Sequence, residues 1–119
     1  MVLVDTSVWI AHLRASDPRL ASLLEEGDVA AHPFVIGELA CGNIRNRREF
    51  LSLMRALPKS PRVEDDEVLF LIERRSLYRR GLGFIDAHLL ASCELGGQTL
   101  WTMDKRLAQA AARLGVAFR

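Results

Sequence analysis

The first seven residues, Met1 to Ser7, constrain the fold of this chain more than any other stretch. Three apolar residues, two of them β-branched, run directly into Asp5 without the polar alternation of a half-exposed strand. Such a run is typical of a strand that is buried on both faces of a parallel sheet. Asp5 is then expected at the carboxyl end of this strand, the edge where open α/β sheets bind their ligands.

The residues after Asp5 predict a helix, because Val8 to Leu13 follow without a turn signal and Ser7 is placed to cap them. A simpler interpretation is that Asp5 or Thr6 only caps this helix and carries no chemistry, since capping is among the commonest roles of Asp. The choice between the two depends on whether other acidic residues converge on Asp5.

Strand-like and helical patterns alternate along the rest of the chain. The predicted strands are Asp28–His32, a short edge strand at Arg62–Val63, Thr99–Thr102 and Gly115–Phe118. The predicted helices are Arg19–Glu26, Pro33–Cys41, Asn46 to Leu57, Glu64 to near Gly81, Phe84–Cys93 and Lys105–Leu114. This alternation predicts an α/β fold in which helices cover both faces of a parallel sheet.

Length and composition indicate a single soluble globular domain spanning residues 1–119. Half of the residues are hydrophobic and 26% are charged, a composition that does not suit a disordered chain. No uncharged stretch approaches the roughly 20 residues of a membrane span, and the early charge at Asp5 argues against a signal peptide. Cys41 and Cys93 lack the spacing of a metal or redox motif, so reduced thiols and a cytoplasmic location are expected.

The formal net charge is only +1, but the charges are unevenly distributed. If four acids belong to one site, eleven of the fifteen face sixteen basic residues, and the rest of the surface carries about +5. Arginine clusters are the candidates for contact with a phosphate-bearing partner, namely Arg45, Arg47, Arg48, Arg79 and Arg80. The alternative is that these arginines form ordinary solvated helix faces.

Four acidic residues occupy positions that suit a shared site. Glu38 and Asp86 lie in helices whose other residues are mostly apolar, and each shares a face with predicted core residues. A buried carboxylate must be paired, neutralised or bound to a metal ion. Asp5 and Asp104 follow the two most strand-like segments, so both overhang one crevice if those strands are neighbours across a switch in strand order.

Electrostatic repulsion within such a cluster favours a cation. Two carboxylates about 5 Å apart repel by roughly 3 kcal/mol at an effective dielectric near 20, so several together resist full ionisation. Ligand sets made only of oxygen select Mg²⁺ or Mn²⁺ over zinc. A site of this kind with arginines nearby suits the hydrolysis of phosphate esters, in which the metal ion activates water and neutralises charge on the phosphate.

Four segments together resemble the motifs of PIN-domain ribonucleases, and specifically the VapC toxins of bacterial toxin-antitoxin pairs. They are Met1–Thr6, the helix that carries Glu38, Asp86–Ala91 and Thr102–Asp104. No single segment is specific, but four in this order and at these spacings are. The resemblance covers essentially the whole chain.

The resemblance implies a three-layer α/β/α sandwich around a parallel sheet ordered 3-2-1-4-5, in which the first and fourth strands are neighbours. It implies that Asp5, Glu38, Asp86 and Asp104 bind Mg²⁺, or Mn²⁺ in its place, and that Asp104 acts through water. Thr6 and Thr102 match small hydroxyl positions of the family. These threonines are expected to contact water or phosphate, or alternatively to cap helices.

The function that follows is a metal-dependent endoribonuclease in which metal-activated water attacks the backbone of structured RNA such as tRNA or rRNA. The resemblance also implies a homodimer and a VapB-like antitoxin, encoded upstream, that lays an amphipathic helix in an apolar groove. The antitoxin would extend a cation towards the acids. No association with a membrane is expected.

Other classes of function fit the sequence less well. A phosphatase with an aspartyl nucleophile needs a second acid two residues after the first, where this chain has Ser7. A receiver domain needs its phospho-acceptor after a middle strand, and a catalytically silent binding module would not need all four acids. His88 lies about 200° round the helix from Asp86, so it is expected to be structural or to face solvent.

Overall fold

A computed structural model describes all 119 residues and places a short parallel sheet at the centre of the molecule. The strands are β1 (Val2–Val4), β2 (Val29–Ala30) and β3 (Thr99–Trp101), in the order β2-β1-β3. Both pairings of β1 are parallel. The prediction that the first strand lies beside the strand preceding Asp104 is therefore confirmed.

Each edge of the sheet is extended by a single parallel bridge. Ala31 pairs with Lys59 on one side and Leu100 pairs with Ala117 on the other. Along the sheet, the segments thus follow the order expected for a 3-2-1-4-5 sheet, but the two outer positions are bridges and not full strands. The predicted edge strand at Arg62–Val63 is wrong, because the pairing lies earlier and Pro61, which has no N–H, cannot continue the ladder.

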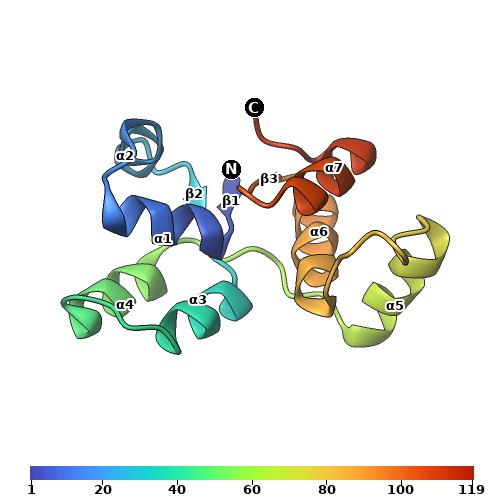
Figure 1. Cartoon of the computed structure of the whole chain (residues 1–119), viewed down its shortest axis with the longest axis horizontal. Coiled ribbons are helices and arrows are strands. Elements are labelled where there is room, and N and C mark those ends of the chain that lie inside the picture. The colour runs from blue at the N-terminus through green and yellow to red at the C-terminus, as the bar shows by residue number, and fades with distance from the viewer.

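Seven helices surround the sheet in two layers, which confirms the three-layer α/β/α architecture. They are α1 (Thr6–Arg14), α2 (Pro18–Glu25), α3 (Pro33–Ala40), α4 (Arg47–Ala56), α5 (Asp65–Arg74), α6 (Phe84–Gly96) and α7 (Lys105–Leu114). Helices α1 to α4 lie on one side of the sheet, and α5 to α7 lie on the other (Figure 1). Each layer therefore supplies part of whatever site forms at the sheet edge.

Two helix boundaries differ from the sequence prediction. Helix α1 begins at Thr6, so Ser7 lies inside it and does not cap it, and the Asp5 side chain accepts no cap hydrogen bond. Helix α5 ends at Arg74, well before Gly81, because Ser76 adopts a left-handed backbone conformation with φ of 52°. The first difference matters for function, since it leaves both side chains free for contacts across the sheet edge.

The core is formed where β1 meets the helices of both layers. Leu3 and Val4 of β1 are completely buried, as are Leu89 and Leu90 of α6. Burial on both faces is the reason that this strand has no polar alternation. Asp5 follows the buried strand directly and is itself 92% buried, since only 8% of its surface is exposed. None of the helices is long and apolar enough to cross a membrane.

A buried histidine joins the start of α3 to α6. His32 is fully buried, and its Nδ1 accepts a hydrogen bond from the Phe34 N–H at 3.0 Å, which caps α3. Its Nε2 lies 3.1 Å from the Ser92 hydroxyl. Because Nδ1 is an acceptor, the proton is on Nε2 and the imidazole is neutral.

Acid is expected to destabilise the fold through His32. Burial, together with the charges of His88 and Arg62, lowers the pKa of His32 from 6.5 to about 4. Between pH 6.5 and 4, His32 therefore takes up a proton in the unfolded chain but not in the folded chain. The free energy of unfolding falls by about 2 kcal/mol by pH 5 as a result. Urea unfolding of the parent and of His32→Asn at pH 7 and pH 5 measures this, because Asn can cap α3 but does not titrate. An equal loss in both proteins would contradict the assignment.

Candidate active site

Asp5 is the centre of a hydrogen-bonded cluster at the carboxyl edge of β1 and β3. Its Oδ2 accepts hydrogen bonds from the Thr102 hydroxyl at 2.7 Å and from the Ser7 hydroxyl at 2.9 Å. The two hydroxyls lie 3.5 Å apart, and Ser7 Oγ also accepts from the Met103 N–H at 3.1 Å. Both hydroxyls thus bind the same oxygen of Asp5, and together they fix the orientation of its carboxylate.

The sheet explains why residues so distant in sequence meet at this point. The Asp5 N–H continues the ladder by donating to the Trp101 carbonyl at 2.9 Å. Thr102 follows Trp101, and its hydroxyl accepts from the Asp104 N–H at 3.1 Å. Asp104 in turn caps α7, because its Oδ1 accepts from the Arg106 and Leu107 N–H groups at 2.9 and 3.4 Å. The pairing of β1 with β3 therefore brings Asp5 and Asp104 to the same edge.

Glu38 differs from the prediction that it shares a buried face of α3. Val35 and Leu39 are buried, but Glu38 and its neighbour Gly37 are exposed, because α3 packs on the molecule along one side only. The carboxylate still points towards the candidate site, since its Oε1 accepts a hydrogen bond from the Thr6 hydroxyl at 2.8 Å. Thr6 thus links Glu38 to the residue next to Asp5.

Asp86 lies in the first turn of α6, where its Oδ2 accepts from the Gly83 N–H at 2.9 Å. Partial burial raises the pKa of Asp86, the Gly83 N–H lowers it, and the charges of Asp5 and Asp104 raise it further. The net effect is a pKa above the usual value. Asp86 from one helical layer and two acids from the sheet edge therefore face one another closely enough to repel.

The four carboxylates share a further property, which fits a divalent cation. Each of them keeps one oxygen that accepts no hydrogen bond from the chain, namely Asp5 Oδ1, Glu38 Oε2, Asp86 Oδ1 and Asp104 Oδ2. Repelling carboxylates with unused oxygens are ready ligands for a hard cation.

The arrangement is open and does not form a closed cage. No group of three or more His, Cys, Asp or Glu side chains is arranged so that it could hold a metal ion. A cation here would therefore contact only one or two of the carboxylates directly, and Mg²⁺ is commonly bound in that way, with waters and substrate phosphates as its other ligands. Asp5 is buried and Asp86 is partly buried, so these two carboxylates are the least hydrated of the four.

Removing one of the repelling charges is expected to stabilise the metal-free protein. Asp86→Asn keeps an oxygen for the Gly83 N–H but removes the charge that faces Asp5 and Asp104. The melting temperature in chelator should rise by about 3–5 °C, which corresponds to roughly 1 kcal/mol. The additional rise on adding Mg²⁺ should shrink. Differential scanning calorimetry of both proteins measures this, and a lower melting temperature of Asp86→Asn in chelator would contradict the cluster.

The structure separates the five arginines that the sequence groups together. Arg47 donates to the carbonyl groups of Ala40 and Gly42 and so ties α4 to the end of α3. Arg45 lines a cavity of about 400 Å³ together with Glu38. Arg48 lies on the exposed first turn of α4. The sequence does not distinguish these roles, because the hydrogen bonds of Arg47 depend on how two helices pack.

The remaining arginines, Arg79 and Arg80, lie in the exposed loop before α6. The Arg80 Nε donates to the Ser76 carbonyl at 2.8 Å, and Arg79 has a positive φ of 62°. This loop leads directly into Gly83, whose N–H holds Asp86. Both arginines are therefore near the candidate site along the chain.

One functional residue was missed by sequence reasoning. Ser7 was expected to cap α1, but its hydroxyl donates to Asp5 and accepts from the Met103 N–H. The only signal in the sequence is the pair of hydroxyls directly after the acid, and that pattern is equally typical of a helix cap. Of the two alternatives expected for His88, burial excludes the solvent-facing one, since His88 is only 1% exposed.

The family of this chain can now be assigned. The model of the PIN domain family matches residues 2–113, and the chain therefore belongs to the PIN-domain family. Within it, the chain groups with the VapC ribonucleases. It is 55% identical over 118 residues to Ribonuclease VapC32 from two strains of Mycobacterium tuberculosis, an alignment that covers 98% of this chain and 95% of the relative.

A solved structure supports the fold independently. The crystal structure of PAE2754 from Pyrobaculum aerophilum superposes with a TM-score of 0.66 at 22% sequence identity, covering 98% of this chain and 87% of that chain. At this level of identity the likeness concerns the fold alone. Family membership favours a nuclease over the phosphatase and receiver alternatives, which Ser7 and the place of Asp5 after the first strand already disfavoured.

Proposed function

We propose that this protein is the toxin of a type II toxin-antitoxin system and acts in the cytoplasm as an Mg²⁺-dependent endoribonuclease, with Mn²⁺ as a possible substitute. Its substrate is structured RNA such as tRNA or rRNA. The observation that carries the proposal is the convergence of Asp5, Asp86 and Asp104 at one sheet edge, where the charges of Asp5 and Asp104 raise the pKa of Asp86 and each carboxylate keeps an unused oxygen. The 55% identity to a ribonuclease supports the reaction class.

Hydrolysis of a phosphodiester needs an aligned water and neutralisation of charge on the phosphate, and a bound divalent cation supplies both. Asp5 and Asp86 would hold that cation through their unused oxygens. The hydroxyls of Ser7 and Thr102 keep the Asp5 carboxylate in place. Asp104, fixed by two N–H groups of α7, presents its second oxygen for orienting water.

Glu38 and Thr6 complete the proposed site from the other helical layer. Glu38 is exposed, so its carboxylate can accept a proton from water or exchange protons with the solvent. Arg45, Arg48, Arg79 and Arg80 are exposed and not paired with acids, which leaves them available for RNA phosphates. Arg47 is partly committed to the end of α3, so its contribution is proposed to be smaller.

The test is RNA cleavage by the purified protein, with Mg²⁺ or Mn²⁺ present, absent, or removed by a chelator. Cleavage of total RNA is expected only with the free cation, and gel analysis of the fragments identifies the RNA that is cut. Cleavage that persists at full rate in excess chelator would overturn metal dependence while leaving a nuclease. No cleavage of any RNA under any of these conditions would overturn the function itself.

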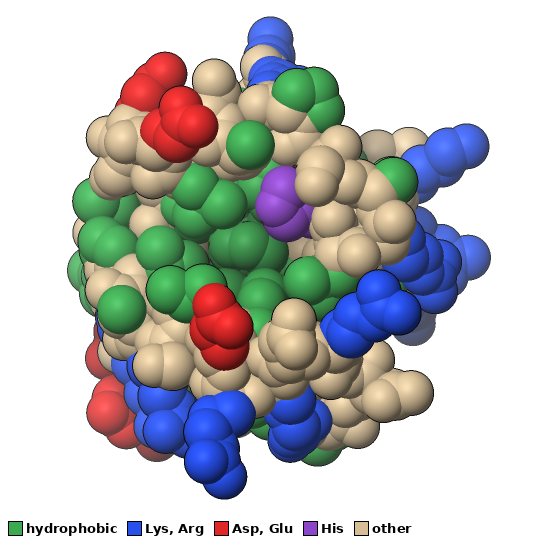
Figure 2. Space-filling view, turned by 90° about the vertical axis from the view of Figure 1, so that its left-hand side faces the viewer, with side chains coloured by type: hydrophobic (Ala, Val, Ile, Leu, Met, Phe, Trp, Pro, Cys, Tyr) green, Lys and Arg blue, Asp and Glu red, His purple; other side chains and the backbone are tan.

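We propose that the antitoxin docks on the face formed by α1, α2 and α4. Hydrophobic side chains gather there in a hollow, with a histidine and an acidic side chain beside it and basic side chains further out (Figure 2). The hollow has a volume of about 400 Å³ and is lined by Trp9, His12, Leu13, Leu24, Phe50, Leu53, Met54, Ala56 and Leu57. An amphipathic helix presents the apolar side chains that such a hollow accepts.

The apolar hollow adjoins a second cavity that contains one of the four acids, Glu38. Leu13 also lines the second cavity, which contains Glu38 and Arg45. A partner that fills the apolar hollow can therefore reach Glu38 with a Lys or Arg, which relieves the same repulsion that attracts the metal ion. Inhibition by the antitoxin is expected to compete with Mg²⁺ for this reason.

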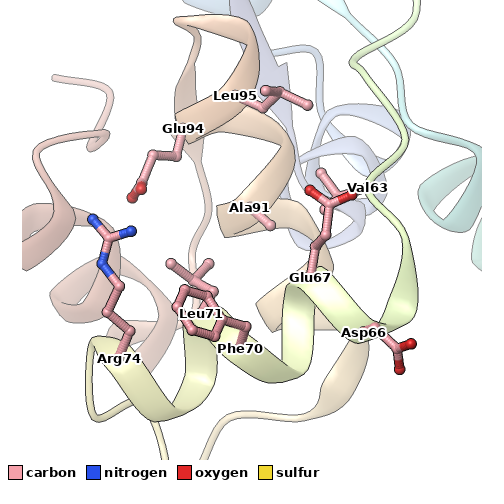
Figure 3. A pocket seen from close by; sticks show the side chains of 9 residues that line it. All are labelled: Val63, Asp66, Glu67, Phe70, Leu71, Arg74, Ala91, Glu94 and Leu95. Carbon is pink, nitrogen blue, oxygen red and sulfur yellow. The ribbon is translucent and has the colours of Figure 1, made fainter.

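We further propose a homodimer that forms through α5 and α6. A shallow cavity of about 520 Å³ lies between these helices, with Phe70 and Leu95 at its rim (Figure 3). Phe70 is 64% exposed and Leu95 is 65% exposed. Glu67 and Arg74 on the same face give it both signs of charge, which suits contact with a second copy of itself.

Phe70→Glu is expected to convert the dimer into a monomer without unfolding it, because Phe70 is exposed in the single chain. A buried charge at a subunit contact costs several kcal/mol, so the dimer should dissociate at least 30-fold more readily. Sedimentation equilibrium of both proteins at tens of micromolar measures this. A parent protein that sediments as a 13.3 kDa monomer would contradict the dimer.

A further inference from the structure

Three aromatic rings join the two helices that carry Glu38 and Asp86. The imidazole of His88 on α6 lies between Phe34 of α3 and Phe84 of α6, at centroid distances of 4.8 and 4.7 Å. Both contacts are edge-to-face, with interplanar angles of 76° and 84°. This geometry is the favourable one for aromatic pairs.

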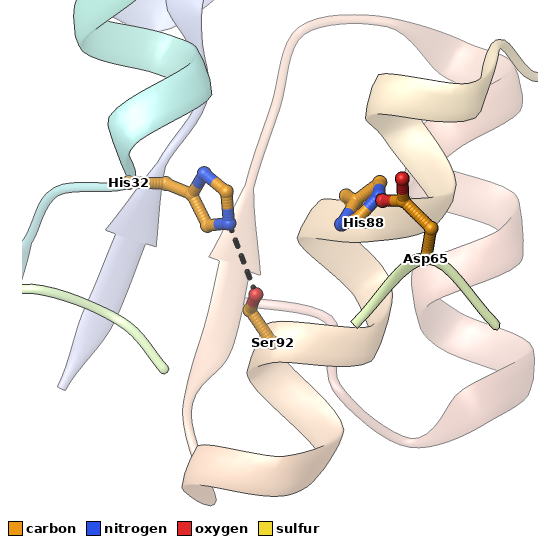
Figure 4. A network of polar contacts seen from close by, with 4 residues as sticks. All are labelled: His32, Asp65, His88 and Ser92. Atoms are coloured by element: carbon orange, nitrogen blue, oxygen red, sulfur yellow. Dashed lines mark hydrogen bonds and ion pairs between the residues drawn. The ribbon is translucent and has the colours of Figure 1, made fainter. Parts of the chain in front are cut away.

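The imidazole of His88 is also fixed by a tether from a third helix. Its Nε2 lies 3.0 Å from Asp65 Oδ1 in the first turn of α5, whereas its Nδ1 is buried without a partner. A carboxylate only accepts hydrogen bonds, so Nε2 carries the proton and the ring cannot turn over without losing this bond. Figure 4 shows Asp65 reaching His88 while, one turn further along α6, Ser92 meets His32.

One of these contacts, that of Phe34 with His88, crosses from one helical layer to the other. Helix α3 belongs to the layer of α1 to α4 and α6 to the opposite layer (Figure 1). Sheet hydrogen bonds fix Asp5 and Asp104 relative to each other, but they do not fix Glu38 relative to Asp86. That spacing depends on side chains that bridge the layers, and the ring pair of Phe34 and His88 is such a bridge.

The positions along each helix connect the rings to the acids. Phe34 lies one turn before Glu38, at the i and i+4 positions that share a face of α3. His88 lies two residues after Asp86, so it fixes the same turn of α6 from the side opposite the carboxylate. The ring contact therefore joins the two helical turns that carry Glu38 and Asp86.

We propose that His88, held by Asp65 and packed against Phe34, is a positioning residue that sets the distance between the Glu38 and Asp86 carboxylates for a divalent cation. The inference rests on the proposed metal-dependent function and adds a residue that touches neither metal nor substrate. Mg²⁺ and Mn²⁺ tolerate little error in ligand placement. Residues that orient metal ligands typically contribute 10–100-fold to metal affinity.

The test is a double-mutant cycle on Mn²⁺ affinity, measured on the full chain without RNA by the electron paramagnetic resonance signal of free Mn²⁺. His88→Ala is expected to weaken Mn²⁺ binding about tenfold. The matched control His88→Phe keeps a ring against Phe34 and should recover most of that loss. Asp65→Ala, at an exposed position, should weaken binding by a smaller factor because the ring remains but is no longer tethered.

The deciding comparison uses Glu38→Gln as the background. If His88 acts by placing Glu38, His88→Ala should weaken Mn²⁺ binding less than twofold once the Glu38 charge is gone. An equal tenfold loss in both backgrounds indicates a general structural role and overturns the inference. If His88→Ala does not fold, Phe34→Leu tests the same contact from a half-buried position in the same two backgrounds.

The outcomes also separate this inference from the function on which it rests. A parent chain that binds Mn²⁺ with an affinity unchanged by His88→Ala or Phe34→Leu overturns the positioning role alone. A parent chain that does not bind Mn²⁺ overturns the proposed metal dependence as well.

Discussion

Asp5→Asn is expected to lower the rate of RNA cleavage by at least about 100-fold. Replacing a residue that only orients a metal ligand commonly costs 10–100-fold, and Asp5 is proposed to be a ligand itself. Asn keeps one oxygen that can accept from Ser7 and Thr102, so the local structure should persist. The substitution instead removes the negative charge that attracts the cation.

The measurement is the initial rate of cleavage of one purified RNA at saturating Mg²⁺, with the folded fraction checked by circular dichroism. Asp28→Asn is the matched control, because Asp28 is half-buried and lies at the opposite, amino edge of the sheet, where it pairs with the amino terminus at 3.6 Å. The control should cleave at nearly the parent rate. Cleavage by Asp5→Asn within a few fold of the parent would refute the proposed role of Asp5.

Leu53→Asp is expected to weaken antitoxin binding by roughly 100-fold, the scale of a central residue at a protein interface. Leu53 lines the hollow between α1, α2 and α4 and is 62% exposed in the free chain. The folded chain should therefore tolerate the charge, whereas a complex that covers Leu53 must bury it without a partner. Isothermal titration with the antitoxin from the neighbouring reading frame measures the change.

Trp9→Phe tests a buried residue that lines the same hollow. Trp9 is only 3% exposed and its Nε1 has no acceptor, so replacing it with Phe should not destabilise the free chain through a lost hydrogen bond. Because Nε1 is itself buried, a docked antitoxin does not reach it, and antitoxin affinity should stay close to that of the parent. Leu69→Asp is the control on the far side of the molecule, on exposed α5, and should leave antitoxin affinity unchanged. Equal affinities for the parent and Leu53→Asp would rule out this hollow as the docking site.

The sequence predicted the buried strand β1 and the alternation of strands with helices because those signals are local, whereas the order of the sheet was implied by the resemblance to PIN-domain ribonucleases. The apolar run of β1 and the turn-free run of α1 that follows it each depend on neighbouring residues alone. The edge strand was placed wrongly because single bridges have no periodic pattern. Its true position, at Lys59, depends on the contact with Ala31 across the sheet.

The sequence also identified the four acids, but it did not predict the environment of each one. The apolar character of α3 predicted burial of Glu38, and the structure exposes it because only Val35 and Leu39 of this helix are fully buried. Periodicity indicates which residues share a face, but it does not say how much of a helix a neighbouring element covers. Asp86 has the partial burial and like-charged neighbours that the repulsion argument required.

By itself, then, the sequence determined which residues carry charge at the ends of β1 and β3 and within α3 and α6, because hydrophobic pattern and motif order are properties of the chain. Only the tertiary structure decided how those charges are held. The bond from Thr102 to Asp5, the bond from Thr6 to Glu38 and the contact of His88 with Phe34 each join residues more than thirty positions apart. Such contacts arise from strand pairing and layer packing, so no local pattern encodes them.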